Sequence, residues 1–134
     1  MKFEYKRISP GVLRPVVPIE IGHNDFFVSY EVLVDSGADM CIFDAEIGEL
    51  IGIDITKGEK KEVYGITGAR PEYYYLHPIK IKVGGWPFSI KAGFLPNLNS
   101  RQNYGVVGQI GFFDLFVVKF DLIKEEIEVN PRKK

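Results

Sequence analysis

The sequence lacks most of the features that point to a membrane, to export or to a nucleic-acid partner. It has one cysteine, Cys41, which cannot close an intrachain disulfide and therefore fits a reducing compartment. No apolar run is long enough to cross a bilayer, and the first residues lack the apolar stretch and cleavage site of a secretory signal. The formal net charge of -1 gives no electrostatic reason to expect nucleic acid or a membrane as a partner. We therefore expect a cytoplasmic protein.

Signals for a metal, a cofactor or a reactive thiol are also weak. His23 and His77 stand outside any cysteine or acidic spacing typical of zinc sites, so exposed or core histidines are the favoured interpretation. Cys41 lies in the apolar segment Met40 to Phe43, which favours a buried, inert thiol over a nucleophile. Ser36 lacks the G-x-S-x-G elbow of a serine nucleophile. We assign no metal and no cofactor.

The sequence does contain alternation with a period of two residues, the pattern of β-strands. Glycine, proline or asparagine separates successive strand candidates. The candidates are Phe3 to Ile8, Val16 to Ile21, Val28 to Val34, Glu62 to Ile66, Tyr73 to Leu76, Ile79 to Val83, Phe88 to Phe94, Phe116 to Asp121 and Ile127 to Val129. Many short strands in 134 residues predict an all-β fold with a closed or sandwiched sheet, in a single domain over residues 1–134.

Two stretches break the alternation. Ala45 to Ile51 and Gly111 to Leu115 are each long enough for one or two helical turns. We therefore expect one or two short helices in an otherwise β protein.

The strongest local signal is an apolar strand, Glu31 to Val34, that runs directly into Asp35-Ser36-Gly37. A carboxylate used in catalysis must be partly desolvated and fixed in direction, and a buried strand that ends in a tight turn does both. Gly37 can adopt a positive φ and lets a substrate backbone approach. The alternative is a plain turn, because aspartate, serine and glycine all favour turns.

Two further motifs favour the catalytic interpretation of Asp35 over a plain turn. Tyr64-Gly65-Ile66-Thr67-Gly68 has glycines on both sides of an apolar tip, which is typical of a mobile hairpin. Val106-Val107-Gly108 follows it and precedes the second predicted helix.

In this order the three motifs resemble those of the retropepsin-like aspartic proteases, the single-lobe, retroviral type. The resemblance implies an acid-protease fold, a closed β-barrel lobe, and peptide hydrolysis with Asp35 as the catalytic carboxylate. It also implies roles for neighbouring residues. Ser36 and Gly37 would lock the two halves together, and Ala38 and Asp39 would lie beside the bound peptide. The remaining roles are a flap formed by Tyr64, Gly65, Ile66, Thr67 and Gly68, a side-chain pocket lined by Val106 and Val107, and a packing glycine, Gly108.

One position departs from the resemblance. Many retroviral-type enzymes have an arginine after the glycine of the second motif, paired with the acid that here is Asp39, and this chain has Gln109 instead. Arg7, Arg14 or Arg101 could pair with Asp39, or Gln109 could offer a neutral hydrogen bond.

The proposed chemistry needs two carboxylates that share one proton, and the sequence has a single Asp-Ser-Gly. A homodimer with a two-fold axis would bring Asp35 against its own copy. The terminal strands, near Phe3 to Ile8 and Ile127 to Val129, are candidates for an intersubunit sheet. We therefore expect a homodimeric aspartic endopeptidase acting on a peptide or protein substrate. The alternative is a catalytically silent domain of the same fold that serves dimerisation or peptide binding.

Overall fold

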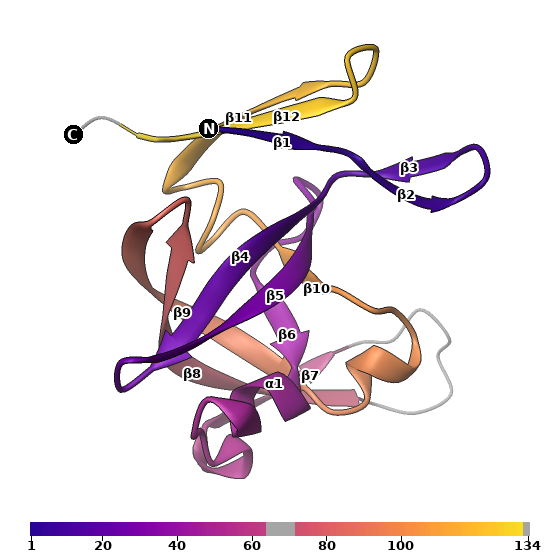
Figure 1. Cartoon of the computed structure of the whole chain (residues 1–134). Helices are drawn as coiled ribbons and strands as arrows, with labels where there is room; N and C mark the ends of the chain where they lie inside the picture. Colours follow the sequence, from indigo (N-terminus) through magenta and orange to yellow (C-terminus); the bar gives the residue numbers. More distant parts are fainter. Residues whose placement is uncertain (64–71, 133–134) are drawn as a thin grey trace.

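The computed structural model describes residues 1–63 and 72–132 (Figure 1). Strands dominate these residues, and the predicted all-β class is confirmed. In chain order the elements are β1 (Lys2–Glu4), β2 (Lys6–Ser9), β3 (Val12–Arg14), β4 (Val16–His23), β5 (Phe26–Val34), β6 (Ile42–Asp44), α1 (Ala45–Leu50), the 3-10 helix η1 (Ile55–Lys57), β7 (Glu59–Val63), β8 (Glu72–Val83), β9 (Trp86–Leu95), the 3-10 helix η2 (Leu98–Ser100), β10 (Gly105–Val107), β11 (Phe116–Asp121) and β12 (Glu126–Pro131).

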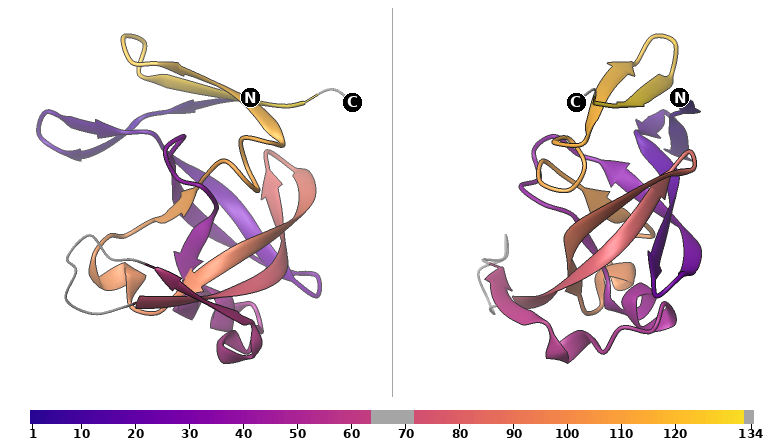
Figure 2. Two further views of the ribbon diagram at one scale, coloured as in Figure 1. Left: turned by 180° about the vertical axis from the view of Figure 1, so that it is seen from behind. Right: turned by 90° about the vertical axis from the view of Figure 1, so that its left-hand side faces the viewer.

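Six strands close into a barrel, as predicted. They follow one another in the order β4-β5-β10-β6-β9-β8, and a second pairing of β8 with β4 completes the ring. Strand β7 extends the sheet beyond β8 as an edge strand (Figures 1 and 2). The barrel therefore presents strand ends, where loops can hold functional side chains, at its two openings.

Alternation along the strands fills the barrel with apolar side chains. In β8, Ile79, Ile81 and Val83 are buried while Lys80 and Lys82 face outward, as their spacing predicts. Phe43 and Phe94 are fully buried at the centre and meet edge to face, with ring centroids 6.0 Å apart. Burial of each such side chain contributes about 2 to 3 kcal/mol to the stability of the folded state. The packed core therefore holds the strand ends in fixed positions.

Proline 78 lies inside β8, which joins two predicted strands, Tyr73 to Leu76 and Ile79 to Val83, into one. On one side of β8, the pairing with β7 ends at Leu76 and the pairing with β4 begins at Lys80. Pro78 sits in the gap between these two neighbours, where its missing N–H removes no ladder bond on that side.

A second, three-stranded sheet covers one opening of the barrel, with the order β1-β12-β11 (Figure 1). Ile127 and Val129 on β12 are buried, and the Phe116 ring of β11 packs against Phe88 of the barrel at 4.9 Å between centroids. β12 is the middle strand of this sheet, with β1 on one side and β11 on the other, and an intersubunit sheet made from the terminal strands stays a prediction.

The predicted N-terminal strand, Phe3 to Ile8, divides in two. Its first part is β1, which pairs with β12, and its second part is β2, which turns away to pair with β3 in a separate hairpin. Long-range pairing with β12 therefore decides where β1 ends, and a local pattern does not contain that information.

Of the two predicted helices, Ala45 to Ile51 is confirmed as α1, and Gly111 to Leu115 is wrong. The second stretch forms consecutive turns. Gly111 has a φ of 101°, which a right-handed helix cannot accommodate, and its N–H donates to Asp114 Oδ1 at 2.9 Å. In the described residues, no helix is long and apolar enough to cross a membrane.

Candidate active site

Asp35 directly follows strand β5, and main-chain hydrogen bonds fix that strand end on both sides. The Asp35 N–H donates to the Val107 carbonyl oxygen at 3.0 Å, continuing the parallel pairing of β5 with β10. On the other side, the Val34 N–H donates to the Pro15 carbonyl oxygen at 2.9 Å. The backbone that carries the Asp35 carboxylate therefore has little freedom.

The loop after Asp35 also orients its carboxylate. The Gly37 N–H donates to Asp35 Oδ1 at 2.9 Å, and the Ala38 N–H donates to the Asp35 carbonyl oxygen at 3.1 Å. Gly37 is suited to this close approach, because a Cβ there would lie 3.3 Å from Asp35 Oδ1. Asp35 is half-buried, while Ser36 and Gly37 are exposed. The arrangement leaves a directed carboxylate that solvent or a ligand can reach.

The second motif forms strand β10, between β5 and β6 in the barrel sheet. Its two valines face opposite ways: Val107 is fully buried in the core, and Val106 is half-buried. Gly108 packs directly against the loop that follows Asp35. A Cβ at Gly108 would lie 2.5 Å from the Ala38 carbonyl oxygen and 2.6 Å from that of Met40. Only glycine lets the two segments approach this closely.

Gln109 joins the two motifs with hydrogen bonds of its own. Its N–H donates to the Ala38 carbonyl oxygen at 2.8 Å, and its Nε2 donates to the Ser36 carbonyl oxygen at 3.0 Å. Next to it, the Ile110 N–H donates to the Asp39 carbonyl oxygen at 3.0 Å. The neutral side chain that replaces the expected arginine thus binds the main chain of the Asp35 loop, not the Asp39 carboxylate.

None of the three candidate arginines pairs with Asp39 in the described part of the chain. Arg7 faces Glu125 at 4.0 Å, and Arg101 forms an ion pair with Glu72. Arg14 donates only to the carbonyl oxygen of its neighbour Leu13, at 3.1 Å. Asp39 itself is exposed, so water can solvate its charge.

The predicted flap residues, Tyr64, Gly65, Ile66, Thr67 and Gly68, lie outside the described residues. What the structure does describe is the pair of strands on either side of them. Strands β7 and β8 run antiparallel, and their pairing continues as far as Val63 opposite Glu72.

Asp44 is a buried structural carboxylate, 1% exposed, that belongs to none of the three sequence motifs. Its Oδ1 accepts the Glu46 N–H at 2.7 Å and so caps α1, while its Oδ2 accepts the Asn99 N–H of η2 at 2.5 Å. Asp44 therefore holds the loop that leads into β10. An aspartate directly before a predicted helix is the signal that could have identified the cap.

Two other buried polar groups lie at the two ends of β6, Tyr30 against Asp44 and Cys41 directly before Ile42. The Tyr30 hydroxyl accepts the Asp44 N–H at 3.2 Å, and burial raises the pKa of Tyr30 to about 12. Cys41 is fully buried, as predicted, and burial raises the pKa of its thiol to about 11. Both groups therefore stay neutral near pH 7.

The described fold has counterparts among solved structures, although no family model and no curated protein matches the sequence. A retropepsin-like aspartic protease from Rickettsia conorii is 18% identical over 98% of this chain and 91% of that chain, with a TM-score of 0.69. The retroviral protease-like domain of Ddi1 from Leishmania major is 15% identical over 87% of this chain and 88% of that chain, with a TM-score of 0.58. The chain therefore has the retropepsin-like fold of aspartic proteases.

Proposed function

We propose that the protein is an aspartic endopeptidase in which Asp35 is the catalytic carboxylate. The observation that carries this proposal is the geometry of Asp35. Its backbone is held by Val107, its Oδ1 accepts the Gly37 N–H, and its side chain is only half-buried. A fixed yet reachable carboxylate suits general acid–base catalysis better than it suits a structural turn.

The reaction requires a second carboxylate close to the first. One carboxylate, ionised, takes a proton from the attacking water, and the other, protonated, donates a hydrogen bond to the scissile carbonyl oxygen. The proton is then available for the leaving amine. Since the chain has a single Asp-Ser-Gly, we propose that a second copy supplies Asp35 across a two-fold axis, with the carboxylates about 3 Å apart.

Two described features support a homodimer with its axis near Asp35. Ile110, next to the Asp35 loop, is 65% exposed, and burial of an apolar side chain of this kind favours association. In the terminal sheet, β1 and β11 each have one edge that pairs with no described strand. Such edges can add a strand from a partner.

The remaining roles follow from position in the proposed dimer. Ser36 and Gly37 would face the partner's loop, Ala38 and Asp39 would border the bound peptide, and Val106 would line a side-chain pocket. Val107 and Gly108 would support that surface from the core. The flap at Tyr64 to Gly68 is proposed from its sequence. We propose one such domain over residues 1–134, acting in the cytoplasm on an extended peptide held by main-chain hydrogen bonds.

The test is to replace Asp35 by Asn and to assay both proteins on a peptide library. We expect kcat/KM to fall by about 10²- to 10⁴-fold, because the asparagine amide can neither take a proton from the attacking water nor share one with a second carboxylate. Asp25→Asn is the matched control: Asp25 is an exposed aspartate in the turn between β4 and β5, and its change should leave kcat/KM as in the native protein.

Cleavage that survives Asp35→Asn would refute the catalytic assignment. A native protein that dimerises but cleaves no peptide would instead indicate the catalytically silent alternative, which no specific observation favours.

A further inference from the structure

The hairpin of β2 and β3, residues 6–14, is an arm whose strands belong to neither of the two larger sheets. It pairs with no other strand, and all four residues of β2 are exposed. Figures 1 and 2 show it extending beyond the barrel, on the same side as the tip of the β11–β12 hairpin. A two-stranded hairpin alone is marginally stable in water, so an arm of this kind gains stability when it lies on another surface.

The base of the arm adjoins the strand end that carries Asp35. Pro15, directly after the arm, accepts the Val34 N–H at 2.9 Å. Lys6 in the arm donates to Glu31 of β5 at 2.5 Å. The arm therefore leaves the molecule beside the position through which the proposed two-fold axis must pass.

The chemistry of the arm suits a protein surface. Residues 6–14 carry three cations and no acid, and the Arg14 guanidinium pairs with no carboxylate in the described part of the chain. Ile8 lies at an irregularity in the β2–β3 pairing and is 44% exposed. The hairpin thus carries both an exposed aliphatic side chain and an unpaired arginine, residue types that serve as interface anchors and charged contacts.

On the basis of the proposed homodimer, we propose that the arm crosses to the second copy and lies on its surface, so that each subunit is held by the other's arm. If two Asp35 carboxylates meet at the axis, the segments attached to the end of β5 lie at the interface. The arm starts there and points away from its own barrel, into the space that the second copy occupies. Ile8 and Arg14 are the residues that it brings to the partner.

The test shortens the arm without changing its base. Arg7 and Leu13 are directly opposite each other, so an Asn-Gly pair in place of residues 8–12 would connect these two residues through a two-residue turn. Sedimentation velocity over a dilution series should then show the dimer dissociation constant raised by at least about tenfold. Circular dichroism should show an unchanged fold, because the residues removed are outside the core.

Point variants keep the test valid if the shortened chain folds poorly. Ile8→Ser should raise the dissociation constant by about three- to tenfold, since it removes one apolar anchor. Phe26→Ser is the matched control, because Phe26 is 52% exposed but lies at the opposite end of β5. It should dimerise like the native chain.

The possible outcomes distinguish a failure of the arm inference from a failure of the proposed homodimer. If the shortened arm and Ile8→Ser both dimerise with the native constant, the arm inference is refuted while the homodimer stands. A native chain that stays monomeric at all concentrations would refute the homodimer itself. At concentrations well above its dissociation constant, the shortened chain should cleave peptide at the native rate per dimer.

Discussion

The two ends of strand β5 each carry an aspartate, and they differ in how firmly that aspartate is held. The Asp35 carboxylate accepts a hydrogen bond from the Gly37 N–H, and the Asp35 N–H donates to the Val107 carbonyl oxygen. Asp25, at the other end, lies in an exposed two-residue turn in which Asn24 and Asp25 have φ values of 52° and 66°. That turn joins β4 to β5 and resembles the common tight hairpin.

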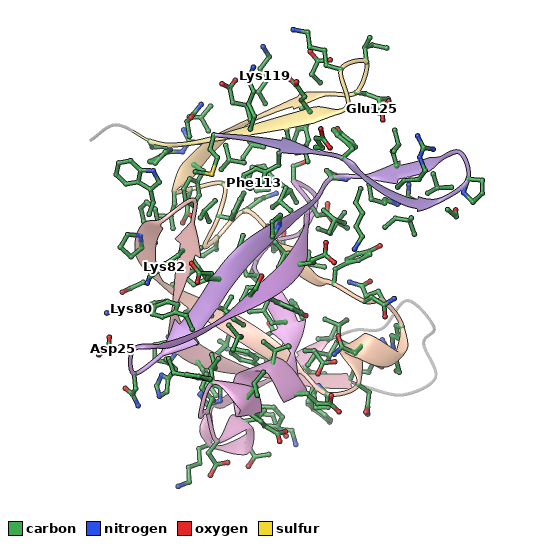
Figure 3. All side chains as sticks on the ribbon, viewed as in Figure 1. Asp25, Lys80, Lys82, Phe113, Lys119 and Glu125 are labelled. Atoms are coloured by element: carbon green, nitrogen blue, oxygen red, sulfur yellow. The ribbon has the colours of Figure 1, made fainter. Side chains whose placement is uncertain are left out.

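The Asp25 end of β5 (the far end) carries a hollow in the surface, whereas the Asp35 end (the near end) carries the fixed carboxylate. A cavity of about 430 Å³ is lined there by polar residues that include His23, Asp25, Lys80 and Ser89. Figure 3 shows Asp25 and Lys80 together at this end, while Lys119 and Glu125 lie on the terminal sheet at the other. We place the chemistry at the near end, because a fixed carboxylate matters more for catalysis than an open hollow, and the proposed cleft at Asp35 is complete only when a second chain is present.

The two ends should differ most in the stability lost when a glycine at each end is replaced by alanine, Gly108 at the near end and Gly22 at the far end. Gly108→Ala at the near end would set a Cβ against two carbonyl oxygens of the backbone, which cannot move without separating the two motifs. We expect a loss of about 3 kcal/mol in the free energy of unfolding, and lower activity. Urea denaturation followed by fluorescence would measure the loss.

Gly22→Ala is the far-end counterpart. Its Cβ would meet the ring of Phe27, a half-buried side chain that can swing toward solvent, so we expect a loss of about 1 kcal/mol. Equal losses for the two variants would mean that the near end is no more tightly packed than the far end.

Asp44 tests whether β10 is also held at its first residues, through the loop that leads into it. Asp44→Ala removes the α1 cap and the acceptor for the Asn99 N–H, and should cost about 2 kcal/mol of stability. Asp54→Ala is a suitable control, because Asp54 precedes η1 without a side-chain cap hydrogen bond. If thermal unfolding shows the same small loss for both, Asp44 does not support the loop that leads to β10.

A further effect concerns pH and the buried interior next to the Asp35 loop, where the Cys41 side chain lies. Cys41 has its pKa raised from 9.0 to about 11 by burial, so the folded state favours the neutral thiol. This contribution is complete below pH 9 and is lost as the pH rises toward 11. At pH 10 the native chain should have lost about 1.4 kcal/mol that Cys41→Ala does not lose. Unfolding free energies of both chains at pH 7 and pH 10 would show it; an equal decrease in both would mean that water reaches Cys41.

Much of the near end was predictable, because its signals are local. A strand that runs into Asp35-Ser36-Gly37, and the small residue at Gly108, can be recognised from neighbouring residues alone. The end of β1 and the turns at Gly111 depend on contacts made after folding, with β12 and with Asp114. The same holds for Gln109, one of several candidate partners for Asp39, whose side chain instead donates to the Ser36 carbonyl oxygen.

The separate hairpin of β2 and β3 could not be predicted from the sequence for a related reason. The alternation from Phe3 to Ile8 indicates a strand but does not say which strand it pairs with. Only the folded chain shows that β2 leaves the terminal sheet and pairs with β3 alone.

The most direct test of the central proposal is to hold the native chain at a fixed concentration, add increasing amounts of the Asp35→Asn chain, and measure peptide cleavage after the subunits have exchanged. If each active site needs Asp35 from both chains, mixed dimers are inactive. Cleavage should then fall to about half when the two chains are equal in amount, and toward zero with excess variant. Cleavage that stays constant at every ratio would contradict the account, because each native chain would then carry a complete active site of its own.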